Sequence, residues 1–298
     1  MKNKITCLLA GAALFGATAN ADIAIADGLT AYGYIDMGAA DTNRDEGRTQ
    51  DFTEYEIGLS FTPAESQWSA VVELSYGKDA GTAASTDFET ATVTYQYSDA
   101  LSFTAGNILS YQGLESYDAP NNNFITYAGS TLNDANGVMY SAGYAEGVSA
   151  DYSAGDITLG VWAEASANAS FEYYAAYSGI ENLTLSAAIA DNTTASGVGD
   201  TLNIMGVYEM GDFTISAENV DVDDTLDLTS FAVAYGMGDT TIALRITEGD
   251  YDGTDYDKTS IAAFHALSDN VAAGVEYSDQ ELGDDDGKGF AVELLYVF

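Results

Sequence analysis

The sequence is poor in several residue types that carry chemistry in other proteins. Its one cysteine is Cys7, its one histidine is His265, and only two of its 298 residues are proline. A single cysteine leaves no internal disulfide, and one cysteine with one histidine cannot supply the ligand sets of zinc and similar metals. His265 is expected to pack near one end of a strand, which disfavours a hydrolytic triad. We therefore expect neither an enzyme nor a cofactor.

Basic residues are also scarce. The chain has eight Lys and Arg against 47 Asp and Glu, which gives a formal net charge of −39 at pH 7. Binding to nucleic acid is driven by Lys and Arg that neutralise phosphates and release counterions. A nucleic-acid partner is therefore not expected.

Long apolar runs are missing after the first residues. Residues 1–21 have Lys2 and Lys4, then an apolar stretch, then Ala19-Asn20-Ala21, which is the order of a secretory signal peptide cleaved after Ala21. Residues 22–298 would then form one domain without a run of 18 apolar residues, the length that a membrane-spanning helix needs. If this domain spans a membrane, it must do so as a closed barrel, because only helices and edgeless sheets pair every backbone group in lipid.

Alternation with a period of two dominates the remaining sequence. Its end, 289–298, places Phe290, Val292, Leu294, Tyr296 and Phe298 on one side of a strand, with Gly289, Ala291, Glu293 and Val297 on the other. The segments 54–61, 68–77 and 241–246 repeat this pattern. One face suits lipid and the other suits a wet interior. A soluble β-sandwich or β-solenoid also alternates, so this pattern alone leaves those folds open.

A repeated turn favours the barrel. An aromatic residue, a short Gly/Ser/Asp/Asn-rich turn and a new strand recur at 97–103, 152–159, 177–185, 208–215 and 235–242. The intervening acidic segments, such as 221–227, 248–257 and 279–286, are expected to form longer loops at the opposite rim, as in outer-membrane barrels. We therefore predict an all-β, transmembrane, antiparallel up-and-down β-barrel of about 16 strands, with 14 to 18 left open. The expected strands begin near Leu29, Glu54, Trp68, Glu89, Leu101, Gly147, Ile157, Ser170, Leu183, Thr201, Phe213, Leu228, Thr240, Thr259, Val271 and Gly289.

The longest connection, 111–146, follows the fifth expected strand. Connections longer than about 15 residues are usually either functional or disordered, and the apolar anchors of this one favour a packed loop. We predict that it folds into the lumen as a constriction; a loop packed outside on the rim is the alternative. The expected constriction residues are Tyr111, Leu114, Glu115, Tyr117, Asp118, Pro120 and Phe124.

The segment 104–129 resembles the corresponding part of the OmpL-like family of outer-membrane β-barrel porins. The resemblance is carried by Gly106, Gly113-Leu114-Glu115, Tyr117-Asp118-Ala119-Pro120 and Phe124, and it covers about 25 residues. It implies a bacterial outer-membrane diffusion porin for small hydrophilic solutes and ions, without naming one. The last strand, with Tyr296 and Phe298, resembles the signal read by the outer-membrane insertion machinery. General porins further imply an outer-membrane lipid environment and a homotrimer.

The expected lumen charge is mostly negative. The lumen acids are predicted to be Asp36, Glu54, Glu56, Glu73, Glu164, Glu276 and Glu293. Arg245 is the one base in the middle of an expected strand, whereas Lys258 is assigned to a strand end. Porins in general set basic residues opposite an acidic loop, and this sequence departs from that pattern. The imbalance predicts a preference for cations. The alternative is that the lumen wall is simply polar and the sign of its charges has no functional meaning.

An alternative function is a structural or adhesive barrel with an occluded lumen and cation-binding surface loops. Asp250, Asp252, Asp255 and Asp257 cluster the oxygen ligands that Ca²⁺ and Mg²⁺ take, but without the spacing of an EF-hand. A solvated acidic surface explains the same cluster. Bulky inward side chains would favour the occluded barrel, and the Gly, Ser, Thr and Ala of the expected lumen favour a pore.

Overall fold

The computed structural model describes residues 23–43, 48–79, 85–115, 118–130, 139, 143–165, 170–191, 199–223 and 225–298. The predicted signal peptide and Tyr117 lie outside these residues. The strands are β1 Ile23–Ala26, β2 Leu29–Asn43, β3 Arg48–Phe61, β4 Trp68–Asp79, β5 Ser85–Gln96, β6 Leu101–Leu109, β7 Tyr144–Ala154, β8 Ile157–Glu164, β9 Phe171–Ile180, β10 Leu183–Asp191, β11 Thr201–Met210, β12 Phe213–Val222, β13 Leu226–Met237, β14 Thr240–Tyr251, β15 Thr254–Ser268, β16 Val271–Leu282 and β17 Asp285–Val297. A short 3-10 helix, η1 Ala119–Asn121, lies between β6 and β7.

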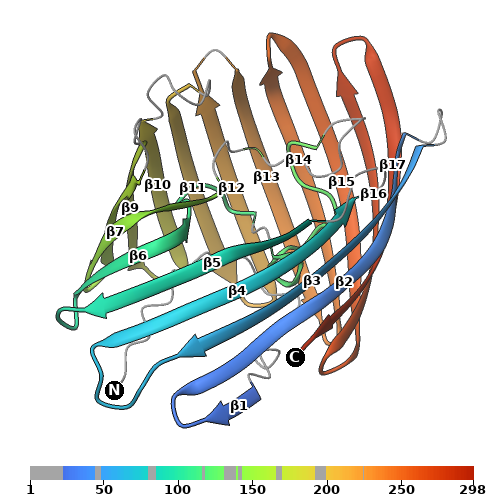
Figure 1. Ribbon diagram of the computed structural model, residues 1–298. Helices are drawn as coiled ribbons and strands as arrows, with labels where there is room; N and C mark the ends of the chain where they lie inside the picture. The colour runs from blue at the N-terminus through green and yellow to red at the C-terminus, as the bar shows by residue number, and fades with distance from the viewer. Residues whose placement is uncertain are drawn as a thin grey trace.

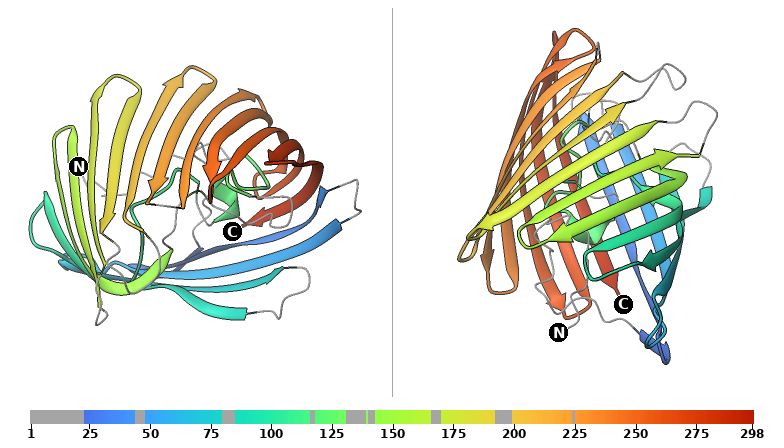
Figure 2. Two further views of the ribbon diagram at one scale, coloured as in Figure 1. Left: turned by 90° about the horizontal axis from the view of Figure 1, so that it is seen from above. Right: turned by 90° about the vertical axis from the view of Figure 1, so that its left-hand side faces the viewer.

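Strands β2 to β17 form a closed barrel of sixteen antiparallel strands (Figure 1). Each strand pairs with its neighbours in the sequence, and β17 pairs with β2 to close the ring. The predicted fold and strand number are confirmed. Seen from above, β2–β5 run along one side of the lumen and the later strands arch over the other (Figure 2).

β1 is a seventeenth strand that the sequence did not reveal. It pairs with the beginning of β2, from Leu29 to Ala31, whereas β17 pairs with β2 from Tyr34 onward. Between them, Phe298 and Gly33 exchange two backbone hydrogen bonds, each 2.9 Å long. β1 and the end of the chain therefore share one edge of β2, and the four residues of β1 are too few to show a distinct alternation.

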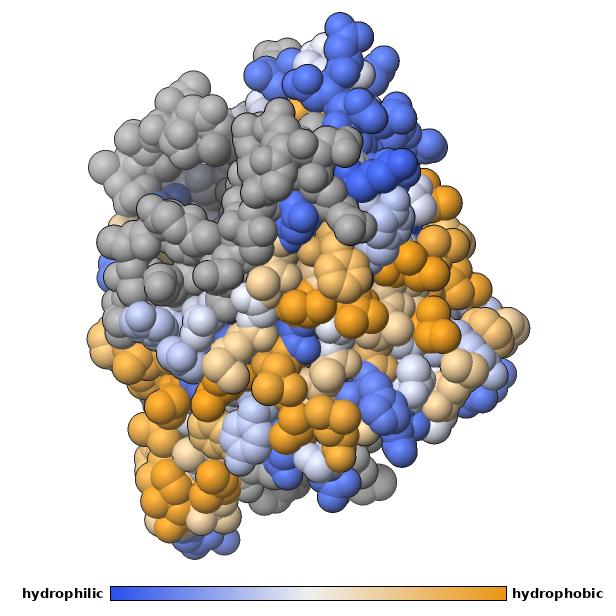
Figure 3. All heavy atoms as spheres, turned by 90° about the vertical axis from the view of Figure 1, so that its right-hand side faces the viewer, coloured by the Kyte–Doolittle hydropathy of each residue, from blue (hydrophilic) through white to orange (hydrophobic). Residues whose placement is uncertain are grey.

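The two faces of the wall follow the predicted alternation. In β17 the side chains of Phe290, Val292, Leu294 and Tyr296 are exposed, while Glu293 and its neighbours on the other face are buried. In β3, Ile57 is 55% exposed and Glu56 only 4%. Figure 3 shows apolar side chains over the middle of one side of the barrel and hydrophilic ones gathered at its upper end. An apolar outer band with a polar interior is what a lipid-facing barrel requires.

The acidic segments that were predicted as long loops are mostly strand. β14 and β15 continue to a turn at Asp252-Gly253, and β16 and β17 continue to a turn at Gly283-Asp284. Asp252 and Gly253 have φ angles of 52° and 76°, which is the left-handed backbone that a tight hairpin turn needs. Beyond the apolar band, a hairpin can continue into water because its two strands still form backbone hydrogen bonds with each other. Acidic side chains are compatible with these solvent-exposed parts of the strands. This is why β3, β5, β15 and β17 begin several residues earlier than expected.

No helix among the described residues is long and apolar enough to cross a membrane.

Candidate constriction site

The connection between β6 and β7 folds into the lumen, as predicted, and its first residues are held by β9. Glu172 of β9, 1% exposed, accepts hydrogen bonds from the Ser110 hydroxyl at 2.8 Å and from the Tyr111 backbone N–H at 2.8 Å. The Gln112 side-chain amide donates to the same carboxylate at 3.2 Å. The Tyr111 hydroxyl donates to Asp151 at 2.6 Å. The chain is thus turned inward directly after β6.

β11 and β12 hold the next two residues. The Gly113 N–H donates to Asn203 Oδ1 at 2.7 Å, and the Leu114 N–H donates to Glu218 Oε1 at 3.2 Å. The Asn203 side-chain amide also donates to Glu218, at 2.9 Å. Because these groups are buried, each backbone N–H has a polar partner that replaces water.

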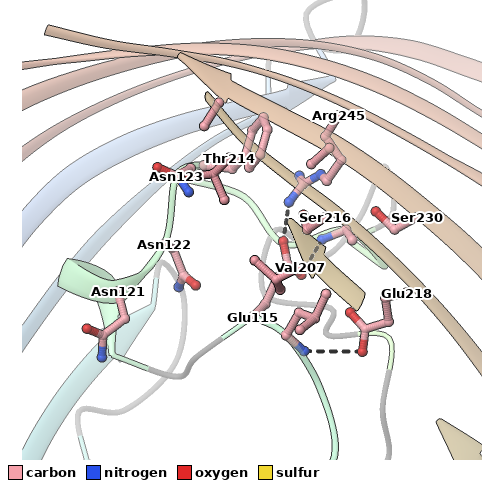
Figure 4. Close-up of a pocket in the computed structure, with 15 residues that line it drawn as sticks. Glu115, Asn121, Asn122, Asn123, Val207, Thr214, Ser216, Glu218, Ser230 and Arg245 are labelled. Carbon is pink, nitrogen blue, oxygen red and sulfur yellow. Dashed lines mark hydrogen bonds and ion pairs between the residues drawn. The ribbon is translucent and has the colours of Figure 1, made fainter. Parts of the chain in front are cut away.

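Arg245 of β14 is the centre of the loop attachment. Its side chain is 2% exposed and forms an ion pair and hydrogen bond with Glu115, shown by a dashed line in Figure 4. A second guanidinium nitrogen donates to the Thr126 carbonyl at 2.6 Å, and the group lies 4.2 Å from the centre of the Phe124 ring. Arg245 therefore joins two parts of the loop, before and after η1, to one strand.

Glu276 of β16 and Lys258 of β15 hold the returning part of the loop. Glu276 accepts from the Ile125 N–H at 2.6 Å and the Thr126 N–H at 2.8 Å. The Lys258 ammonium donates to Thr126 Oγ1 at 2.9 Å, to the Tyr127 carbonyl at 2.8 Å and to the Ser130 hydroxyl. The Arg245 guanidinium lies 3.8 Å from Glu276, so Arg245 and the loop share this carboxylate.

A separate group of carboxylates lies by β3 and β5. Glu56 of β3, Glu89 of β5 and Asp118 of the loop each offer an oxygen, and these oxygens lie within 4.8 Å of one another. Glu56 Oε2 and Glu89 Oε2 are buried and have no hydrogen-bond partner. Three carboxylates this close favour a bound proton or cation among them, because their negative charges repel one another and are partly withdrawn from water.

Further acids of β2, β3 and β4 face the same side of the lumen. Glu73 accepts a hydrogen bond from the Tyr32 hydroxyl at 2.5 Å, and Glu54 accepts one from the Tyr34 hydroxyl at 2.6 Å. Asp36 of β2 and Glu293 of β17 interact where these two strands meet.

Glu164 lies apart from these groups. It is the last residue of β8, at the rim opposite the short turns, where the Ser170 N–H lies 3.5 Å from its Oε2 atom.

The prediction for Lys258 was wrong. β15 begins at Thr254 instead of near Thr259, so Lys258 lies within the strand and faces inward, 2% exposed. Sequence reasoning also missed Glu89, Glu172 and Glu218. Glu172 could have been found from its alternation with Phe171 and Tyr173, whereas Glu89 was taken as the beginning of a strand that begins at Ser85.

Pro120 forms part of η1, and Ala119 packs against the inner face of β2, β16 and β17. The four aspartates considered for Ca²⁺ or Mg²⁺ lie at the β14–β15 hairpin, where Asp250 Oδ1 accepts from the Gly253 N–H at 2.7 Å. They are not among the groups of three or more carboxylates whose oxygens come within 4.8 Å in the described residues. Cation binding there stays a prediction.

A family model described as Gram-negative porin matches residues 8–285. The chain belongs to the Gram-negative porin family. The barrel fold and this family place the porin in the bacterial outer membrane, as the resemblance had implied, and neither the family nor the fold is enzymatic.

Solved structures of similar fold include three variants of the Rhodopseudomonas blastica porin. Each has a TM-score of 0.67, with sequence identities of 18%, 17% and 18%. Each alignment covers 91% of this chain and 100% of that porin. A likeness at this identity supports the fold. A search of curated proteins with the sequence finds no match.

Proposed function

We propose that this porin lets small cations pass in preference to anions. The observation that carries the proposal is the group of three carboxylates, Glu56, Glu89 and Asp118, with oxygens within 4.8 Å of one another. Charges of one sign in a narrow passage with low-dielectric walls focus the potential and concentrate counterions. Screening acts over about 8 Å at physiological salt, so an ion that passes a constriction is within reach of these charges.

Arg245 and Lys258, the inward-facing bases among the side chains that the structure describes, do not offset this field. Arg245 is paired with Glu115 and lies 3.8 Å from Glu276, and Lys258 donates three hydrogen bonds to the loop. Their positive charges therefore interact with groups of the loop and its attachment, and not with the open lumen. An anion in the lumen would meet an excess of carboxylates.

Glu115 and Asp118, which the sequence placed together in the constriction, have different environments. Glu115 accepts from Arg245 and, at 2.7 Å, from the Ala128 N–H. Asp118 joins the carboxylates of β3 and β5. We assign Glu115 to loop attachment and Asp118 to the attraction of cations.

Planar-bilayer recordings of the purified porin test the proposal. In a KCl gradient the reversal potential should show K⁺ preferred over Cl⁻, and the preference should weaken as salt rises because screening shortens. A reversal potential that favours Cl⁻ at low salt would contradict it.

The number of loop attachments favours one alternative, a barrel whose lumen is closed by the loop. Hydrogen bonds to β9, β11, β12, β14, β15 and β16 hold the described part of the loop inside. The same recordings separate the two functions, since a closed barrel of intact fold would give no single-channel steps.

A further inference from the structure

The strand β5 carries one residue more than its partner β4 at Glu89. Glu89 and Thr90 of β5 together lie opposite the single residue Glu73 of β4. Counting back in steps of two from Val93, which is exposed on the outer face, would place Glu89 on the lipid side of the wall. The extra residue reverses that alternation, as β-bulges do, so that Phe88 faces outward and Glu89 faces the lumen.

The next strand, β6, is shaped to hold this bulge. The Asn107 side-chain amide donates to the Phe88 carbonyl at 3.0 Å and to the Glu89 carbonyl at 2.5 Å. The backbone pairing of β5 with β6 ends at Ala91 and Asn107, so this amide takes the place of a backbone donor. Gly106 has a φ angle of 137°, and a Cβ atom on it would lie 1.9 Å from the Ala91 carbonyl oxygen. Both residues thus help to fix the position from which Glu89 enters the lumen.

The three carboxylates that meet there have the spacing of a calcium site. Ca²⁺ binds carboxylate oxygens at about 2.3–2.6 Å, so two oxygens on one ion lie at most about 5.2 Å apart. The oxygens of Glu56, Glu89 and Asp118 lie within 4.8 Å of one another. One ion can therefore contact all three side chains.

Glu56 gives a second, independent indication of a bound ion. It is 4% exposed, and its Oε2 atom, like that of Glu89, is buried without a hydrogen-bond partner among the described residues. A bare ion between these oxygens needs no opening of the size of water, because it approaches an oxygen to about 2.4 Å, whereas a water hydroxyl stays at about 2.7–2.8 Å. Glu89 and Asp118 are half-buried, so the ion reaches the group from their side.

We propose that Glu56, Glu89 and Asp118 form a Ca²⁺ site that joins the inner loop to β3 and β5. Arg245 attaches the loop to β14 with a fixed positive charge, and Ca²⁺ attaches it to the opposite strands with an exchangeable one. Mg²⁺ suits the site less well, because it keeps several waters and demands an octahedral shell. The inference rests on the proposed function, since the same carboxylates attract K⁺, and bound Ca²⁺ lowers the preference for K⁺ by offsetting their charge.

Calorimetric titration of Ca²⁺ into the detergent-purified, EDTA-treated porin tests the site, in about 0.1 M KCl to screen weak contacts with exposed acids. Glu89→Gln removes one ligand. Asn107→Ala removes the two hydrogen bonds to the bulge and leaves the net charge unchanged, so weaker binding in this variant cannot come from a smaller negative charge. Asp255→Asn/Asp257→Asn is the control, because it removes two exposed carboxylates from the β14–β15 hairpin. Circular dichroism checks that each variant is folded.

We expect one Ca²⁺ to bind per chain of the unaltered porin and of the hairpin control, and to bind at least about tenfold more weakly to Glu89→Gln and Asn107→Ala. Absence of Ca²⁺ binding, equal binding by all four proteins, or a loss only in the hairpin control would overturn the site. Unchanged binding by Asn107→Ala would overturn the part assigned to the bulge, and tighter binding of Mg²⁺ would overturn the choice of ion.

Reversal potentials in a KCl gradient with EDTA report on the proposed function separately. A preference for K⁺ without Ca²⁺ binding would show that only the site is wrong. Ca²⁺ binding without a preference for K⁺ would show that only the proposed function is wrong.

Discussion

The charged residues of two parts of the barrel wall differ in what they contact. The clamped wall, which comprises Glu172, Glu218, Arg245, Lys258 and Glu276, binds the inner loop through hydrogen bonds and ion pairs. The acidic wall, which comprises Asp36, Glu54, Glu56, Glu73 and Glu89, contacts tyrosine hydroxyls and other carboxylates. In Figure 2 the loop lies in the lumen between β2–β5 and the arch of later strands.

Glu276 and Glu56 show what the difference means. Both are buried, at 2% and 4% exposure, but Glu276 accepts hydrogen bonds from Ile125 and Thr126 and lies near Arg245. Glu56 instead lies beside two further carboxylates and keeps one oxygen without a partner. The same residue type thus attaches a loop where donors surround it. Where no donors do, as at Glu56, we propose that the carboxylates attract mobile cations.

Deleting Phe298 should have the largest effect, because Phe298 lies where β17 pairs with β2 and closes the barrel. Phe298 and Gly33 exchange two backbone hydrogen bonds, and the Phe298 ring lies 6.0 Å from that of Tyr296. We expect most of the protein to be lost from the outer-membrane fraction, measured by fractionation and blotting. Phe298→Tyr should assemble normally, and normal yield of the deletion would show that the final aromatic is dispensable for closure and assembly.

Arg245→Met should release the loop from the clamped wall. It leaves the half-buried Glu115 and the buried Glu276 without Arg245, and breaking a buried ion pair costs about 3–5 kcal/mol. We expect faster proteolysis within the loop, unsteady single-channel currents and a stronger preference for K⁺, because Glu115 and Glu276 lose their positive neighbour.

Arg245→Lys keeps the charge and is the control for that variant. It should protect the loop from proteolysis better than Arg245→Met does. It still loses the planar guanidinium that bonds Glu115 and the Thr126 carbonyl with two separate nitrogens. If the Met variant kept steady currents and a protected loop, Arg245 would not be the main attachment.

Tyr34→Phe should have a small effect, confined to the acidic wall. The substitution removes the 2.6 Å hydrogen bond from the Tyr34 hydroxyl to Glu54, which is worth about 1 kcal/mol. Urea unfolding in detergent should show a barrel less stable by about that amount. Tyr55→Phe, on the exposed face, is the comparison; if both variants unfolded alike, the buried hydroxyl would add nothing to stability.

The strands could be predicted from the sequence to a large extent, because side-chain alternation fixes both their position and their faces. Ten of the expected beginnings, such as Trp68, Leu101 and Phe213, fall where a strand begins or within one residue of it. The exceptions lie mainly at the acidic rim, where Thr254–Lys258 was taken for a loop because its aspartates resemble solvated turn residues. Paired strands that extend into water carry the same polar composition as loops.

The site could be predicted only in part. The loop and its inward course followed from its length and its apolar residues, and Arg245 and Glu276 were placed in the lumen by alternation. Their partnership with Glu115 and Thr126 joins residues more than 100 positions apart. No local pattern tells which acid of the lumen meets a base, and for this reason Glu115 was grouped with Asp118.

We propose that the acidic wall, together with Asp118 of the loop, sets the ion preference of the porin. The variant Glu56→Gln/Glu89→Gln/Asp118→Asn removes three carboxylates from the lumen, and the control Asp252→Asn/Asp255→Asn/Asp257→Asn removes three from the β14–β15 hairpin, where these residues are exposed. Reversal potentials in a KCl gradient should show that the lumen variant loses most of its K⁺ preference, while the hairpin variant stays close to the unaltered porin. An unchanged preference in the lumen variant, or an equal loss in both, would show that these three carboxylates do not set the ion preference.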